Sequence, residues 1–145
     1  MNDFERRVRA RIMSFFRETS RAPSMEALAL ALGASSRNVS AALHRLAAEH
    51  ALVLKPGSDT IWMAHPFSAV ETDFSVTIGA RAWFGNCAWD GLSILALFGD
   101  GELRTHSPAS GSLLRFGVSA GTVSGAGLVH FLVPARNFWD DIAFT

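Results

Sequence analysis

The spacing of apolar residues changes from a helical period to a period of two near residue 65, and this change constrains the fold more than any other feature. In residues 1–50 apolar side chains recur every three to four positions, as on one face of an α-helix. Beyond residue 70 they alternate with polar ones, as in half-buried strands. The sequence therefore predicts an α+β protein of two units. An N-terminal helical unit, residues 1–64, packs on a mainly antiparallel sheet formed by residues 65–145.

Three helices and a hairpin are predicted in the first unit. The first helix has an apolar stripe, which comprises Phe4, Val8, Ile12 and Phe15. Ser24 can cap the second helix and Gly33 can end it in a left-handed conformation. Ser35 or Ser36 can cap the third. Its buried stripe comprises Val39, Leu43 and Leu46, with Ala42 and Ala47 beside them. A hairpin over residues 51–63 turns at Pro56-Gly57, so the unit is similar to a winged helix-turn-helix.

Two interpretations of this unit stay open. In the first, the third helix enters the major groove of DNA with an exposed set of side chains, namely Arg37, Asn38, Ser40, His44 and Arg45. In the second, the unit is scaffolding that docks on the rest of the chain. The chain is neutral, with 13 basic and 13 acidic residues, and residues 1–60 carry nine Lys and Arg against six Asp and Glu, a net charge of about +3. This weak charge favours the structural interpretation.

The second unit is predicted to alternate strands with one helix. A connector over residues 65–69 leads to a hairpin over residues 74–85 that turns at Gly79, and a helix runs from Cys87 to about Phe98. Further strands are expected at three segments, namely residues 102–107, 112–119 and 128–134. Glycine and serine place residues 119–127 in a loop. A short helix or turn over residues 135–141 precedes an extended segment at residues 142–145.

The only cysteine of the chain, Cys87, lies three residues before Asp90 at the predicted start of that helix. Helix N-termini favour negative charge, which lowers the pKa of a thiol, whereas the Asp90 carboxylate opposes its ionisation. Such a pair can act as a proton shuttle, in which sulfur holds a soft electrophile and the carboxyl group carries the proton. Trp83, Phe84 and Trp89 are candidate walls of the pocket. Alternatively, Cys87 is a small buried apolar residue and Asp90 only a favourable charge in the first helical turn.

Other chemistries find little support in the sequence. The five histidines have no paired metal-ligand spacing, no CxxC motif is present, and no glycine-rich stretch matches a phosphate-binding loop. One cysteine cannot form an intrachain disulfide, and arginines interrupt the apolar positions of the N-terminus. No apolar run is long enough to cross a bilayer. We therefore expect a cytoplasmic protein without a membrane partner.

The segment "WFGNCAWDGLSILALFG", residues 83–99, resembles the part of alkylmercury (organomercurial) lyases that carries an active-site cysteine and the catalytic aspartate. "IWMAHPFSAV", "HSPASGSLLRFGVS" and "VHFLVPARNFWDDIAFT" follow the order of that family, so the resemblance covers most of the chain. It implies protonolysis of a carbon–mercury bond in a small organomercurial substrate. Cys87 is then the mercury ligand and Asp90 the proton carrier. Mercury is substrate and product, no organic cofactor is implied, and the winged-helix portion belongs to the enzyme body.

The chain departs from the family pattern because it lacks a second active-site cysteine. The resemblance implies another active-site cysteine just after the segment "FWDDIAFT", where this sequence ends at Thr145, and Ser107 stands where some relatives have a further cysteine. We expect either a truncated form, incomplete at its C-terminus, or a divergent member in which mercury binding survives better than turnover. The alternative function is a winged-helix DNA-binding or metal- or thiol-sensing regulatory module.

Overall fold

Helices dominate the first third of the chain and the strands follow it, as the change of period predicts. The computed structural model describes residues 1–143. Its α-helices are α1 (Asp3–Thr19), α2 (Met25–Leu32), α3 (Ser36–Ala48) and α4 (Ala88–Phe98), and a 3₁₀ helix, η1, spans Ala135–Asp140. None of the helices in residues 1–143 is long and apolar enough to cross a membrane.

One antiparallel sheet runs through both predicted units. Its strands are β1 (Val53–Leu54), β2 (Ile61–Ala64), β3 (Phe67–Ser68), β4 (Ser75–Ile78), β5 (Arg81–Gly85), β6 (Gly101–His106), β7 (Leu113–Ser119) and β8 (Thr122–Ser124). They lie in the order β1-β2-β3-β5-β4-β6-β7-β8. The α+β class and the hairpins at Pro56-Gly57 and Gly79 are confirmed. The predicted connector over residues 65–69 contains β3, which pairs with β2 and β5 and carries the sheet across the expected boundary.

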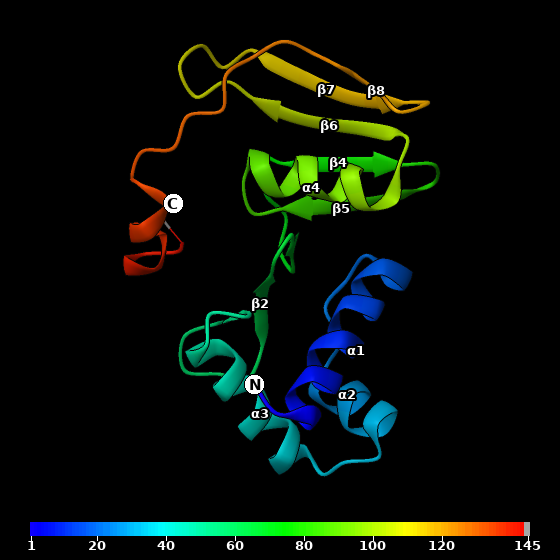
Figure 1. Cartoon of the computed structure of the whole chain (residues 1–145), viewed down its shortest axis with the longest axis vertical. Coiled ribbons are helices and arrows are strands. Elements are labelled where there is room, and N and C mark those ends of the chain that lie inside the picture. Colours follow the sequence, from blue (N-terminus) through cyan, green and yellow to red (C-terminus); the bar gives the residue numbers. More distant parts are fainter. Residues whose placement is uncertain (144–145) are drawn as a thin grey trace.

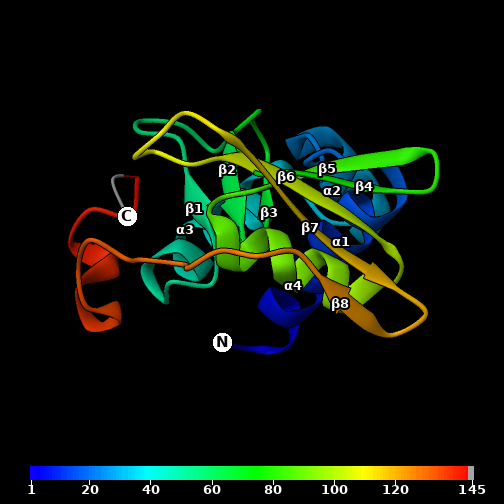
Figure 2. The same cartoon turned by 90° about the horizontal axis from the view of Figure 1, so that it is seen from above.

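The two ends of the sheet have different surroundings. Figure 1 shows α1–α3 beside the β2 end and α4 across β4 and β5, and Figure 2 shows α4 on one side of those strands. One core of buried side chains spans both parts. The indole Nε1 of Trp83 donates a hydrogen bond to the carbonyl of Phe16 at 2.7 Å, and the Phe16 ring stacks on Phe67 at 5.0 Å. Helix α1 is therefore fixed directly to strands β3 and β5.

The buried stripe of α1 differs from the prediction at one position. Val8, Ile12 and Phe16 are at most 1% exposed, whereas Phe15 is only half-buried, with the Arg11 guanidinium 4.9 Å from its ring centroid. Residues 8, 12 and 16 lie one above another at i, i+4 spacing, and position 15 lies to one side of that row. The sequence contains phenylalanine at both positions, and contact with Phe67 decides between them.

The predicted helix caps are confirmed. The Ser24 hydroxyl accepts from the N–H of Ala27 at the start of α2, and Gly33 ends that helix with φ +59°. Ser35, rather than Ser36, caps α3. Because these bonds satisfy backbone groups that a helix leaves unpaired, the short polar residues determine where α2 and α3 begin.

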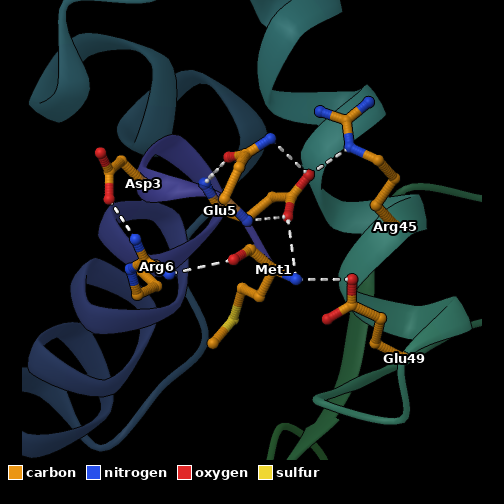
Figure 3. Close-up of polar contacts among 7 residues, drawn as sticks. Met1, Asp3, Glu5, Arg6, Arg45 and Glu49 are labelled. Carbon is orange, nitrogen blue, oxygen red and sulfur yellow. Dashed lines mark hydrogen bonds and ion pairs between the residues drawn. The ribbon is translucent and has the colours of Figure 1, made fainter.

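A buried carboxylate joins α1 to α3. Figure 3 shows Glu5, 3% exposed, between the Arg45 guanidinium of α3 and the chain's N-terminus. Its Oε2 accepts from the backbone N–H of Asn2, whose own side chain accepts from the N–H of Glu5. These bonds, the Asn2 one foremost and then Arg45, hold the pKa of Glu5 below its usual value. The network occupies Arg45, one of the side chains considered for DNA contact.

The C-terminal part contains the largest errors of the sequence prediction. Residues 128–134 are not a strand, and β8 lies inside the stretch predicted as a loop. A tight turn with positive φ at Ala120 and Gly121 folds β8 back on β7, so the outer edge of β7 is already paired when the chain reaches residue 128. The short helix at residues 135–141 is confirmed as η1. Residues 142 and 143 lie in a turn, and the rest of the predicted extended segment, residues 144 and 145, lies outside the described residues.

Candidate active site

The strand-to-helix turn predicted around Cys87 is present, and two glycines bring its sides together. Strand β5 ends at Gly85 and α4 begins at Ala88. A Cβ atom on Gly85 would lie 2.7 Å from the backbone nitrogen of Gly91 and 3.1 Å from the carbonyl oxygen of Cys87. Only glycine permits so close an approach of two backbones, and the approach fixes the first turn of α4 against the end of β5.

Cys87 is the N-cap residue of α4. Its backbone is extended (φ −150°), and its Sγ accepts a hydrogen bond from the N–H of Asp90 at 3.5 Å. The residue is half-buried. Burial raises the pKa of the thiol above its usual value, and the Asp90 charge raises it further, while the N–H bond opposes both effects. The N–H groups of the first helical turn lower the thiol pKa, as expected, but desolvation has the larger effect, so the net shift is upward.

Asp90 lies beneath this cap, with its side chain 12% exposed. Its Oδ2 accepts a hydrogen bond from Nδ2 of Asn86 at 2.7 Å and lies 3.2 Å from Nδ1 of His65. The two nitrogen atoms are 3.4 Å apart. Asp90 thus donates its backbone N–H to the sulfur, while its carboxyl group bonds to Asn86, so the thiol and the carboxyl group both belong to the start of α4.

Sequence reasoning missed three residues around Asp90. His65 and Asn86 contact its carboxyl group, and Trp139 contacts His65. Asn86 stands four residues before Asp90, a spacing that could have indicated the contact. His65 comes from the link between β2 and β3, and Trp139 comes from η1, so neither has a local signal. The Trp139 ring meets His65 edge-on, with centroids 5.9 Å apart, and stacks on His50 at 4.1 Å.

Comparison with known proteins identifies the family of the chain. A model of the family described as MerB, alkylmercury lyase, matches residues 67–145, which is more than half of the chain. The chain belongs to the alkylmercury lyase family. The matched region contains Cys87, Asn86, Asp90 and Trp139 and begins two residues after His65.

A solved lyase structure shares the fold. The chain is similar to the crystal structure of the mercury-bound form of MerB2, with 20% sequence identity and a TM-score of 0.70, over 86% of this chain. This chain spans about 60% of the length of that one. No curated protein matches the sequence. The structural likeness supports the lyase-family α+β architecture.

The aromatic residues proposed as pocket walls lie in different places. Trp83 is in the core, 4% exposed, against Phe98 of α4 with ring centroids 5.1 Å apart. Trp89 is 64% exposed, and Phe84 is half-buried on β5. The aromatic ring that contacts the Asp90 cluster, through His65, is Trp139.

A surface groove lies apart from the cysteine. An open groove of about 500 Å³ runs between the end of α3, the β1–β2 hairpin and the C-terminal segment. Its lining includes His44, His50, Leu52, Lys55 and Trp139. Neither Cys87 nor Asp90 borders it, so the thiol and the carboxyl group, rather than the groove, identify the candidate active site of this family member. Within residues 1–143, no cluster of three or more His, Cys, Asp or Glu side chains could hold a metal ion.

Proposed function

We propose that the chain binds organomercurial compounds through Cys87 and cleaves their carbon–mercury bond with a proton carried by Asp90. The observation that carries the proposal is the hydrogen bond from the Asp90 N–H to the Cys87 sulfur, which places the only thiol of the chain and a mostly buried carboxyl group in one helical turn. Membership of the alkylmercury lyase family supports the same reaction.

Binding is the first step. The Cys87 sulfur replaces one ligand X of an R–Hg–X compound, forming a sulfur–mercury bond, and its proton passes to Asp90 as X leaves as an anion. Mercury favours this exchange because it is a soft metal and thiolate is the softest ligand among protein side chains. The raised pKa of Cys87 makes a nearby proton acceptor useful at neutral pH.

Protonolysis is the second step. The carbon–mercury bond breaks, its electron pair takes the proton from the Asp90 carboxyl group, and the hydrocarbon RH leaves while mercury(II) stays on sulfur. The electrons and the proton balance without an oxidant, a reductant or an organic cofactor. A positioned proton donor of this kind contributes a rate factor of about 10²–10⁴.

With only one protein thiol, cleavage of the carbon–mercury bond is slow, because a second sulfur ligand on mercury would raise the electron density at carbon. The 145 residues contain no other cysteine. A small thiol in the buffer can supply that ligand and can also remove mercury(II) after cleavage. We therefore expect mercury binding by the chain alone and measurable cleavage only with added thiol.

The test measures mercury stoichiometry and hydrocarbon release separately, in single turnovers with excess protein and added thiol. Wild type binds one mercury per chain. Cys87→Ser does not bind, because a neutral hydroxyl is a poor ligand for a soft metal. Asp90→Asn binds mercury but releases hydrocarbon more slowly by a factor on the order of 10². Tight mercury binding by Cys87→Ser would refute the assignment.

For residues 1–64 we propose a structural role as the first of two units, with residues 65–145 as the lyase core. Three of the side chains considered for DNA contact already bind other residues of the same chain. Ser40 and His44 hold the Asp59 carboxylate, and Arg45 holds Glu5. These contacts leave a weak basis for reading DNA. A reducing compartment such as the cytoplasm would keep the Cys87 thiol free.

A further inference from the structure

We propose that His65 and Asn86 are positioning residues that hold the Asp90 carboxyl group in the orientation needed to protonate carbon. This inference rests on the proposed lyase function and deepens it. The recorded hydrogen bonds to this carboxyl group from the described residues fall on one oxygen, Oδ2, which is 2.7 Å from Asn86 Nδ2 and 3.2 Å from His65 Nδ1.

The chemistry of the three groups fixes the direction of these bonds. A carboxylate only accepts, so Asn86 presents its amide nitrogen to Oδ2. Its amide oxygen and the Nε2 of His65 are both buried and have no hydrogen-bond partner among the described residues. A buried N–H without an acceptor is costly, so the tautomer that fits this site has its proton on Nδ1 and donates it to Oδ2.

Both donors are fixed in turn by the fold. Asn86 lies between β5 and α4, where the Gly85–Gly91 approach leaves little freedom. His65 lies between β2 and β3, and the Trp139 ring stands against the imidazole. Two donors from different parts of the chain thus define the carboxyl plane.

The two oxygen atoms of the Asp90 carboxyl group therefore have different roles. Oδ2 is occupied by the two donors, and Oδ1 is left to exchange a proton with the thiol and then with carbon. Loss of one donor allows the carboxyl group to rotate, and small misplacements of a catalytic group reduce rates strongly.

The experiment compares His65→Asn with His65→Leu. The asparagine amide nitrogen can occupy the place of Nδ1 and donate to Oδ2, whereas leucine cannot. In single turnovers with added thiol, we expect His65→Leu to release hydrocarbon at least about 10-fold more slowly than wild type, with mercury stoichiometry and substrate affinity unchanged. We expect His65→Asn to retain a rate within about 3-fold of wild type, and His130→Leu, at an exposed position, to behave as wild type.

Two outcomes overturn the inference. Equal, slow rates for both His65 variants would mean that the imidazole itself carries the proton, and a wild-type rate for His65→Leu would mean that the contact has no role. If wild type releases no more hydrocarbon than Cys87→Ser, the proposed function fails instead. The positioning contact is then decided by ¹⁵N NMR of the imidazole. Protonation on Nδ1 in wild type that moves to Nε2 in Asp90→Ala supports the contact, and protonation on Nε2 in both proteins refutes it.

Discussion

The N-termini of α3 and α4 share one backbone arrangement and differ in the atom that caps it. Before α3, Ser35 is extended and its Oγ accepts from the N–H of Asn38 at 3.3 Å. Before α4, Cys87 is extended and its Sγ accepts from the N–H of Asp90 at 3.5 Å. Ser35 is exposed, whereas Cys87 is half-buried.

The Ser35 cap stabilises the start of α3, whereas the Cys87 cap provides a reactive thiol at the start of α4 at some cost in stability. Serine is among the preferred N-cap residues, and thiol sulfur is a weak acceptor. Helix α4 also carries Asp90 with its side chain 12% exposed, where the carboxylate loses much of its hydration and depends on Asn86 and His65. Departures from the best local choice are expected at functional sites, and here several occur within one turn.

The largest expected effect comes from disrupting the close approach between Gly85 and Gly91 that fixes α4 against β5. In Gly85→Ala, the new Cβ would meet backbone atoms of Gly91 and Cys87 that cannot rotate away. We expect a loss of about 2–3 kcal/mol in the free energy of unfolding, measured by denaturant titration, and a parallel loss of hydrocarbon release. Gly91→Ala is the comparison variant, because its Cβ would meet Cγ and both Cδ atoms of the buried Leu103 side chain rather than backbone, and alanine favours the helix, so we expect a smaller loss. Equal losses for the two variants would contradict the proposed close approach.

A smaller effect is expected from exchanging the caps. Ser35→Ala should cost about 1 kcal/mol of unfolding free energy, and Ser35→Cys about half of that. Cys87→Ser should change stability by less than about 1 kcal/mol, in the stabilising direction, because oxygen is the better acceptor. Thermal and denaturant unfolding of the three variants measure these differences. A large destabilisation by Cys87→Ser would show that sulfur is needed for packing rather than for chemistry.

The contrast also explains what the sequence could predict. The limits of α2 and α3 follow from Ser24, Gly33 and Ser35, since capping depends on residues within one helical turn. The start of α4 and the Cys87–Asp90 pair are local for the same reason. His65 and Trp139 reach the site from 25 and 49 residues away, measured from Asp90, and only the folded sheet and η1 bring them there.

Other errors have the same origin. The choice of Phe16 over Phe15 depends on Phe67, a residue of β3 that stacks on it. The position of β8 depends on the pairing of β7, and the raised pKa of Cys87 depends on burial. None of these quantities is a property of the local sequence.

If the position of the thiol, and not its presence alone, gives the chain its chemistry, then moving the thiol to another helix start should abolish cleavage. The double variant Ser35→Cys, Cys87→Ser keeps one cysteine at a helix N-cap but places it beside Asn38 instead of Asp90. Hydrocarbon release from an organomercurial is measured in single turnovers with added thiol, alongside mercury stoichiometry. We expect wild type and the double variant each to bind one mercury, and only wild type to release hydrocarbon above the rate of the thiol buffer. Equal release by the two proteins would contradict the account, because any accessible thiol would then suffice.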